Sequence, residues 1–195
     1  MTEMMIAAAL GYFAGSVPFG LVCAYLAGLG DIRKIGSGNI GATNVLRTGH
    51  KLAAFGTLIG DAGKGGAVVG MMLALGWTDQ APLAGLAAVV GHCYPLWLRF
   101  KGGKGVATAI ATLAVLYWPA GLTMAVTWLI MSALFRISSL SALTGFATAT
   151  LISALSFDGW PYICAIAALS YWRHRENIAR IFAGTESKIS FKKSV

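Results

Sequence analysis

A basic, glycine-rich turn between two apolar runs is the part of this sequence best equipped for chemistry. Residues 91–108 read GHCYPLWLRFKGGKGVAT and hold three Lys and Arg residues spaced among glycines. Cations attract an anion, and glycine lets backbone N–H groups approach it where a side chain would block them. The stretch is not a P-loop, because Leu98 and Gly105 occupy positions that require glycine and Ser or Thr. We expect it to bind phosphate through Gly102, Gly103 and Lys104.

A second cluster of small polar residues lies at 36–47, GSGNIGATNVLR. Its glycines, hydroxyls and amides could form a nest for a phosphate or a polar headgroup, with Arg47 as a cationic arm. Ser, Gly and Asn are equally favoured in a turn followed by a helix cap, so a structural interpretation stays open. The candidate binding residues of this cluster are Ser37, Gly38, Asn39, Thr43, Asn44 and Arg47.

A third polar cluster follows the last apolar run. On a helix, His174, Asn177 and Arg180 would share one face. His174 is a candidate general base or hydrogen-bond donor at neutral pH, and we pair it with Asn177 as the candidate catalytic residues. Arg180 and Glu186 are candidate binding residues beside them.

Several other polar residues accompany these clusters. Arg136 and Ser139 add a cation and a hydroxyl on the same side of the chain, and we include them among the candidate binding residues. Asp61 and Lys64 are spaced i, i+3 and are expected to pair, as charges near a membrane usually do. The remaining histidines stand beside glycines near the ends of apolar runs and are expected to make structural hydrogen bonds: His50 and His92.

The composition places these clusters in a membrane protein. Hydrophobic residues make up 57% of the 195 residues and charged residues 11%, which is too apolar for a soluble domain. We predict an all-α integral membrane bundle with a single domain over 1–195 and seven spans. The expected spans are Met4–Leu29, Gly65–Trp77, Ala81–Leu98, Val106–Trp118, Ala120–Phe135, Leu140–Phe157 and Trp160–Trp172.

The second of these spans has two possible starts. It could begin near Leu52 and carry Asp61 and Lys64 inside it, or Leu52–Gly60 could be a separate re-entrant or interfacial piece. The three cysteines of the chain lie in or beside apolar runs without CxxC spacing. We therefore expect no disulfide framework and no metal site.

Positive charge is confined to one set of loops. With seven spans, all Lys and Arg residues except Lys64 fall in the loops at 31–51, 99–104 and 136 and in the tail from 173. Because such residues favour the cytoplasm, we predict an N-terminus outside and a C-terminus in the cytoplasm. The net charge of +8 then reflects topology and not a nucleic-acid partner. The basic end of the tail, SKISFKKSV, is expected to be loosely ordered and attracted to anionic lipid.

Taken together, the clusters resemble those of one known family. The stretches 36–47, 91–108 and 174–188 are similar, in this order, to motifs of the bacterial glycerol-3-phosphate acyltransferases that use acyl-phosphate, the PlsY family. DAGKGG at 61–66 and RISSL at 136–140 also resemble that family, and the similarity spans nearly the whole chain.

The resemblance implies a fold and a reaction. It implies a seven-helix enzyme of the bacterial inner membrane with its active site facing the cytoplasm and membrane lipid around it. Such an enzyme moves a fatty acyl group from acyl-phosphate to the 1-hydroxyl of glycerol-3-phosphate, giving lysophosphatidic acid and phosphate in phospholipid biosynthesis. The resemblance implies no cofactor, and neither acyl-CoA nor acyl-carrier protein as donor. In agreement, no Asp lies five residues after any His, so the HxxxxD pair of other acyltransferases is missing.

Both substrates of that reaction carry phosphate, and this suggests roles for the clusters. One phosphate would lie against Ser37, Asn39 and Arg47. The other, by family likeness that of glycerol-3-phosphate, would lie against Gly102, Gly103 and Lys104. His174 and Asn177 would orient the glycerol hydroxyl or help to remove its proton, although a substrate phosphate could take that proton instead.

The alternative function is a membrane transporter of an organic phosphate, because cations inside a membrane protein can line a pathway. The opposite face offers no Lys or Arg for a second gate, and the sequence has no evident inverted repeat. A scaffold that binds anionic lipid would not explain the face formed by His174, Asn177 and Arg180.

Overall fold

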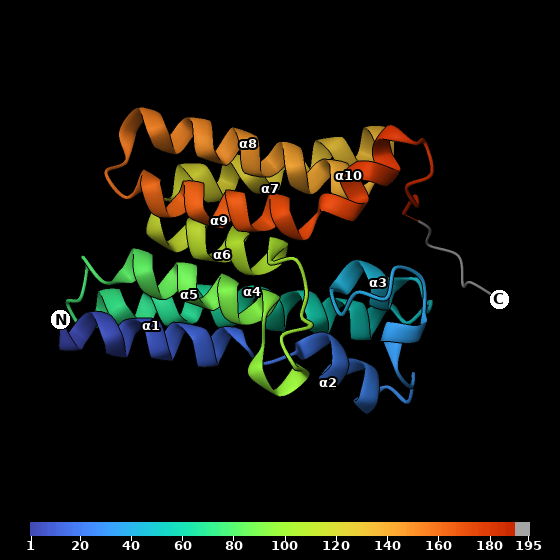
Figure 1. Ribbon diagram of the computed structural model, residues 1–195, viewed down its shortest axis with the longest axis horizontal. Helices are drawn as coiled ribbons and strands as arrows, with labels where there is room; N and C mark the ends of the chain where they lie inside the picture. Colours follow the sequence, from blue (N-terminus) through green and yellow to red (C-terminus); the bar gives the residue numbers. More distant parts are fainter. Residues whose placement is uncertain (190–195) are drawn as a thin grey trace.

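The computed structural model describes residues 1–189, and within this range every regular element is helical (Figure 1). Lys192 and Lys193 of the expected basic tail lie outside the described residues. The α-helices are α1 (Thr2–Gly15), α2 (Phe19–Leu26), α3 (Ala42–Leu46), α4 (Lys51–Ala74), α5 (Ala81–Cys93), α6 (Val106–Leu116), α7 (Trp118–Phe135), α8 (Ser138–Ser156), α9 (Trp160–Arg173) and α10 (Arg175–Phe182). Two short 3-10 helices are η1 (Ile32–Lys34) and η2 (Leu96–Leu98).

The long helices lie side by side along one direction (Figure 1). Helices α1, α4 and α5 pack on one another, α7, α8 and α9 form a second group, and α6 lies between the two groups. Four segments are long and apolar enough to cross a membrane: Thr2–Leu26, Ala81–Leu98, Trp118–Phe135 and Ser138–Ser156. The all-helical architecture expected from the sequence is confirmed for the described part of the chain.

Helix α4 resolves the two alternatives for the second apolar segment. It runs without a break over 24 residues, so Leu52–Gly60 is the first part of a helix that continues through Asp61 and Lys64. At 1.5 Å per residue it is about 36 Å long, enough to cross a hydrocarbon core of about 30 Å. Leu52–Gly60 is thus helical and continuous with the residues that follow, which favours the longer of the two alternatives.

The first apolar segment, expected as one span over Met4–Leu29, is two helices. Helix α1 ends at Gly15 and α2 begins at Phe19. Pro18 explains the break, because it has no N–H to donate and its ring disfavours helical geometry in the preceding residue. The break leaves the Val17 carbonyl oxygen free of the helix, and it accepts a hydrogen bond of 2.8 Å from Lys64 Nζ.

The polar clusters meet at one end of this bundle. Helices α3 and α10 and the loop that follows α5 lie together there, although they are far apart in the sequence (Figure 1). Because the expected spans alternate in direction, the sequence had already placed all three clusters on the same side of the membrane.

Candidate active site

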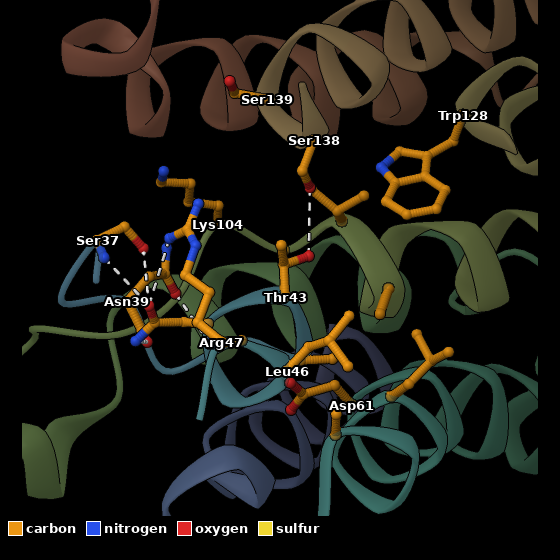
Figure 2. A pocket seen from close by; sticks show the side chains of 18 of the residues that line it. Ser37, Asn39, Thr43, Leu46, Arg47, Asp61, Lys104, Trp128, Ser138 and Ser139 are labelled. Carbon is orange, nitrogen blue, oxygen red and sulfur yellow. Dashed lines mark hydrogen bonds between the residues drawn. The ribbon is translucent and has the colours of Figure 1, made fainter. Parts of the chain in front are cut away.

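Two adjoining cavities open where the polar clusters meet. The first has a volume of about 550 Å³ and the second about 520 Å³. The first has an apolar wall from α3, α4, α6 and α7 and a polar mouth (Figure 2). This wall, which we call the apolar wall, consists of Leu46, Phe55, Leu58, Ile110, Trp128 and Leu129.

The second cavity is a cationic basin. Its lining includes the side chains of Arg47, Lys104, Arg173, Arg175 and Arg180. The two cavities adjoin and share part of their lining. Six residues line both of them: Ser37, Asn39, Arg47, Lys104, Asn177 and Ser187. An anion bound in the basin would therefore lie next to a group held against the apolar wall.

The 36–47 cluster is a rigid turn built around one buried amide. Asn44 is only 2% exposed. Its Oδ1 accepts a hydrogen bond of 3.1 Å from the Ser37 N–H, and its Nδ2 donates to the carbonyls of Ile32 and Asn39. Gly38 has a φ of 68°, a left-handed conformation that favours glycine. Asn44 thus holds the turn, while Ser37, Gly38 and Asn39 line the basin.

Arg47 crosses from this turn to the C-terminal segment. Its NH2 group donates a hydrogen bond of 2.6 Å to Ser187 Oγ, and its NH1 group lies 3.4 Å from Asn44 Oδ1. Thr43, from the same cluster, lines the first cavity and lies 3.2 Å from Ser138 Oγ, joining α3 to the start of α8 (Figure 2). The turn is therefore tied to two elements distant in sequence.

A network of charge-assisted hydrogen bonds connects Lys104 to Glu186. Lys104 Nζ donates to Asn177 Oδ1, and Asn177 Nδ2 donates to Glu186 Oε1 at 2.6 Å. Glu186 also accepts from Ser139 Oγ at 2.8 Å and from Arg180 Nε at 2.7 Å. Burial raises the pKa of Glu186, but these three hydrogen bonds outweigh it, so its pKa is lowered and the carboxylate stays charged.

The ammonium of Lys104 has an unusual environment for a loop residue. Burial lowers its pKa to about 8, and the neighbouring Arg180 and Arg173 add to this effect against the attraction of Glu186. The surroundings of Lys104 therefore destabilise its charged form, and an incoming phosphate would stabilise that form.

The glycines of the 99–105 loop have a different role from the one expected. The Gly102 N–H donates to the Cys93 carbonyl at 3.1 Å, and the Gly103 N–H donates to the His92 carbonyl at 2.9 Å. Those two N–H groups are thus used within the chain, and the expectation that they face an anion is wrong. The carbonyls of both glycines accept hydrogen bonds from Arg173, at 2.9 and 3.0 Å. Gly102 lines the basin and Gly103 lies buried against His92.

Gly103→Ala should reveal this packing role. A Cβ at Gly103 would overlap Nε2 of the buried His92 ring, so the loop or the ring must move. We expect the free energy of unfolding to fall by about 1–3 kcal/mol, as for overpacking of a buried site. Thermal unfolding in detergent measures this, with Gly63→Ala as the matched control, because a Cβ at Gly63 would meet no atom within 4 Å. Equal stability of the two variants would contradict this role.

His174 lies between two helices and not within one. Helix α9 ends at Arg173 and α10 begins at Arg175, so the expected single helical face is interrupted at His174. The chain still brings the three residues to the site, since His174 lines the first cavity, Arg180 the second and Asn177 both. His174 and Asn177 are 2% and 3% exposed.

The protonation of the His174 ring follows from its partner. Its Nδ1 lies 2.7 Å from the Ser170 carbonyl, which can only accept a hydrogen bond, so the proton is on Nδ1 and Nε2 is left as an acceptor. Burial and the nearby Lys104 ammonium lower the pKa of His174 to about 4. The ring is therefore neutral at physiological pH and has a free lone pair.

Arg136 lines neither of the two cavities. Its NH2 group donates a hydrogen bond of 3.0 Å to the Ile189 carbonyl, and its own carbonyl accepts from the Ile189 N–H. These bonds fasten the segment that follows α10 to the start of α8. That segment carries Glu186 and Ser187 into the site, so Arg136 acts on the site through the position of this segment.

Sequence reasoning missed four features of the site. Arg173 and Arg175 read as anchors at the end of a span, and Ser187 reads as part of a solvated tail. The apolar wall could not be separated from ordinary lipid-facing residues. The expected Asp61–Lys64 pair is confirmed, with a salt bridge of 2.8 Å between Nζ and Oδ1.

Fold and site together define a helical membrane protein that can hold a phosphate beside a long apolar group. The chain belongs to the glycerol-3-phosphate acyltransferase family, whose model matches residues 5–184. It is 53% identical to the glycerol-3-phosphate acyltransferase of Paramagnetospirillum magneticum, over 99% of this chain and 97% of that one. It is 54% identical to that of Maricaulis maris, over 100% and 92% of the two chains.

Two solved structures have the same fold. The first is PlsY (YgiH), an integral membrane glycerol 3-phosphate acyltransferase, in its glycerol 3-phosphate form. It has a TM-score of 0.89 and 34% identity, over 96% of each chain. The lysophosphatidic acid form of the same protein has a TM-score of 0.88 and 32% identity, over 97% of this chain and 96% of that one. The family resemblance noted from the sequence is thereby confirmed.

Proposed function

We propose that this protein transfers a fatty acyl group from acyl-phosphate to the 1-hydroxyl of glycerol-3-phosphate, giving lysophosphatidic acid and inorganic phosphate. Family membership supports the acceptor and the product class. The hydroxyl oxygen forms a bond to the acyl carbon, the bond from that carbon to the phosphate oxygen breaks, and phosphate leaves with the electron pair. No cofactor takes part in this reaction.

One observation carries the proposal: a cationic basin and an apolar cavity share six lining residues. The acyl chain of the donor fits against the apolar wall, and glycerol-3-phosphate fits in the basin. The two reactive groups then meet between Lys104 and Asn177, which line both cavities. Because phosphate is a good leaving group, positioning and charge stabilisation supply most of the catalysis.

We assign roles to the candidate residues on this basis. Lys104 and Arg180 bind the glycerol-3-phosphate phosphate, and Ser37, Asn39 and Arg47 bind the phosphate of the donor. Glu186 and Ser139 orient Asn177 and Arg180 through the hydrogen bonds described above. His174 accepts a hydrogen bond from the glycerol hydroxyl through Nε2, and Asn177 orients the same group.

The proposal includes a membrane arrangement. One domain over 1–195 spans the bacterial inner membrane seven times, with the N-terminus outside and the C-terminus in the cytoplasm. The confinement of Lys and Arg to one set of loops supports this orientation. The site then faces the cytoplasm, where soluble glycerol-3-phosphate meets a membrane-borne acyl chain. The four long apolar helical segments and the 24-residue α4 support the multi-span arrangement.

A donor comparison tests the function. Purified protein is incubated with glycerol-3-phosphate and either palmitoyl phosphate or palmitoyl-CoA, while lysophosphatidic acid and phosphate are followed. We expect product with palmitoyl phosphate, phosphate release in a 1:1 ratio to it, and no product with palmitoyl-CoA. Product from palmitoyl-CoA alone would overturn the donor assignment. Uptake of labelled glycerol-3-phosphate into liposomes without esterification would instead favour a transporter.

A further inference from the structure

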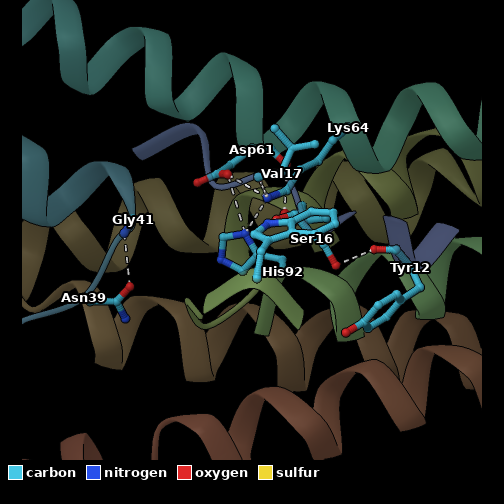
Figure 3. Close-up of polar contacts among 10 residues, drawn as sticks. Tyr12, Ser16, Val17, Asn39, Gly41, Asp61, Lys64 and His92 are labelled. Carbon is cyan, nitrogen blue, oxygen red and sulfur yellow. Dashed lines mark hydrogen bonds and ion pairs between the residues drawn. The ribbon is translucent and has the colours of Figure 1, made fainter. Parts of the chain in front are cut away.

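Three buried charged or polar side chains form a cluster (Figure 3), and two of them, Asp61 and His92, line the first cavity. The side chains of Lys64, Asp61 and His92 are 3%, 4% and 5% exposed. Lys64 Nζ lies 2.8 Å from each of three partners: Asp61 Oδ1, the Val17 carbonyl oxygen and His92 Nδ1. The cluster thus joins α4, α5 and the break between α1 and α2.

This arrangement determines which nitrogen of His92 carries the proton. An ammonium has three N–H donors and no acceptor, so the three partners of Lys64 use all its hydrogens. His92 Nδ1 lies 2.8 Å from the ammonium and 3.5 Å from Asp61 Oδ1, so it accepts from Lys64 in preference to donating to Asp61. The neutral imidazole therefore carries its own proton on Nε2.

The Nε2–H group is the free end of this cluster. Its nitrogen has no hydrogen-bond partner within residues 1–189. Nε2 is also not completely buried. Within residues 1–189, the completely buried side-chain nitrogen and oxygen atoms that lack a hydrogen-bond partner are the hydroxyls of Thr112, Thr150 and Ser170. His92 lines the first cavity and not the basin, and its second ring nitrogen points away from Asp61 and Lys64 (Figure 3). Nε2 lies beside Gly103, where an added Cβ would overlap it, but it has neither a partner among the described residues nor a complete cover. A partly accessible donor on a residue that lines a cavity calls for an acceptor on a bound molecule.

We propose that His92 is a further catalytic residue, whose Nε2–H donates a hydrogen bond to the carbonyl oxygen of the acyl donor. The inference rests on the proposed function. His92 lines the first cavity, whose apolar wall takes the acyl chain of the donor, and it does not line the basin that takes the phosphate of glycerol-3-phosphate. As the glycerol oxygen bonds to the acyl carbon, negative charge develops on the carbonyl oxygen, and a fixed donor stabilises it.

No proton leaves His92 in this step. The imidazole keeps its hydrogen, the phosphate departs with the electron pair of the broken carbon–oxygen bond, and the hydroxyl proton moves to His174 or to the departing phosphate. Lys64 and Asp61 are positioning residues, because they fix the ring orientation and the tautomer of His92.

Two substitutions separate donation from structural support. Asparagine reaches only to the Nδ1 position, so His92→Asn can still accept from Lys64 but has no group at Nε2. Glutamine reaches further and places an amide nitrogen near Nε2, so His92→Gln keeps a donor toward the cavity. We expect His92→Asn to lower kcat by about 100-fold, the effect of removing one such donor. His92→Gln should stay within about tenfold of the wild type, since an amide N–H replaces the imidazole donor.

A purely structural His92 predicts the opposite order, because only asparagine preserves the contact with Lys64. Equal losses in the two variants, or a smaller loss in His92→Asn, would therefore overturn the inference. The matched control is His50→Asn, since His50 caps α4 and lines neither cavity, and it should leave kcat unchanged. Wild-type turnover of palmitoyl phosphate tests the proposed function separately, so a failure there is distinguishable from a failure of this inference.

A second measurement needs no His92 variant. Nitrogen NMR of histidine-labelled wild-type protein, assigned with His50→Gln and His174→Gln, reports the protonated nitrogen of His92. We expect a proton on Nε2 and a change in its signal when a non-transferable acyl phosphonate is added. A proton on Nδ1, or an Nε2 signal that the phosphonate leaves unchanged, would overturn the inference.

Discussion

Lys104→Met is expected to lower kcat/KM for glycerol-3-phosphate by at least about 1,000-fold, or about 4 kcal/mol of transition-state stabilisation. Lys104 donates to Asn177 and lines both cavities, so it is the cation that a phosphate meets at the junction. Methionine keeps most of the apolar stem and removes only the charge and the donors. The loss therefore reports the charge-assisted hydrogen bonds and not a cavity.

The matched control for Lys104→Met is Lys101→Met. Lys101 belongs to the same loop but is exposed and lines neither cavity. A simple loss of positive charge near the membrane would affect both variants alike. A Lys101→Met loss as large as that of Lys104→Met, or turnover of Lys104→Met near that of the wild type, would contradict the assignment.

The pH dependence of the wild type gives a second test of Lys104. Its pKa is lowered to about 8, so the ammonium is present below pH 8 and is lost as the pH rises through that value. We expect kcat/KM, which reports the free enzyme, to fall above about pH 8. Lys104→Arg should move this fall to higher pH, because a guanidinium stays charged there.

Local patterns were sufficient to predict most of the fold. The long apolar runs became helices, and confinement of Lys and Arg to alternate loops predicted that three distant clusters would lie on one side of the membrane. Pro18 is a readable signal for the break between α1 and α2. The break at His174 has no Pro or Gly to announce it, so an uninterrupted helical face over 174–180 was the natural expectation.

Contacts between distant residues account for what the sequence did not predict. The charges of Asp61 and Lys64 left the start of α4 ambiguous in the sequence, because charged residues inside an apolar segment need partners. Two of the partners of Lys64, the Val17 carbonyl and His92, come from other parts of the chain. The Gly103 N–H appears available in sequence, but the fold pairs it with the His92 carbonyl. A glycine-rich loop thus predicts a close approach of backbone without indicating which partner approaches.

The second large effect is expected at His174. We expect His174→Gln to lower kcat by about 1,000-fold, within the range of general base catalysis, with KM for glycerol-3-phosphate within about threefold of the wild type. The reason is the free lone pair on Nε2, which the Nδ1 contact with the Ser170 carbonyl leaves exposed to the first cavity. A glutamine oxygen can accept a hydrogen bond there, but it cannot take the hydroxyl proton as the new bond forms. A variant that raises KM and leaves kcat unchanged would instead show that His174 only positions the acceptor.

The pH profile separates a neutral His174 from an ordinary histidine. Because its pKa is lowered to about 4, the accepting form is present above that value and is lost only as the pH falls through it. Titration of the substrate phosphates affects the wild type and His174→Gln equally, so it divides out of the ratio of their kcat values. We expect this ratio to be constant between about pH 5.5 and pH 7.5, whereas a histidine with the unperturbed pKa of about 6.5 would make it fall below neutrality. A constant ratio together with the large loss in kcat would mean that burial and Lys104 keep this imidazole in its neutral, hydrogen-bond-accepting form throughout the physiological range.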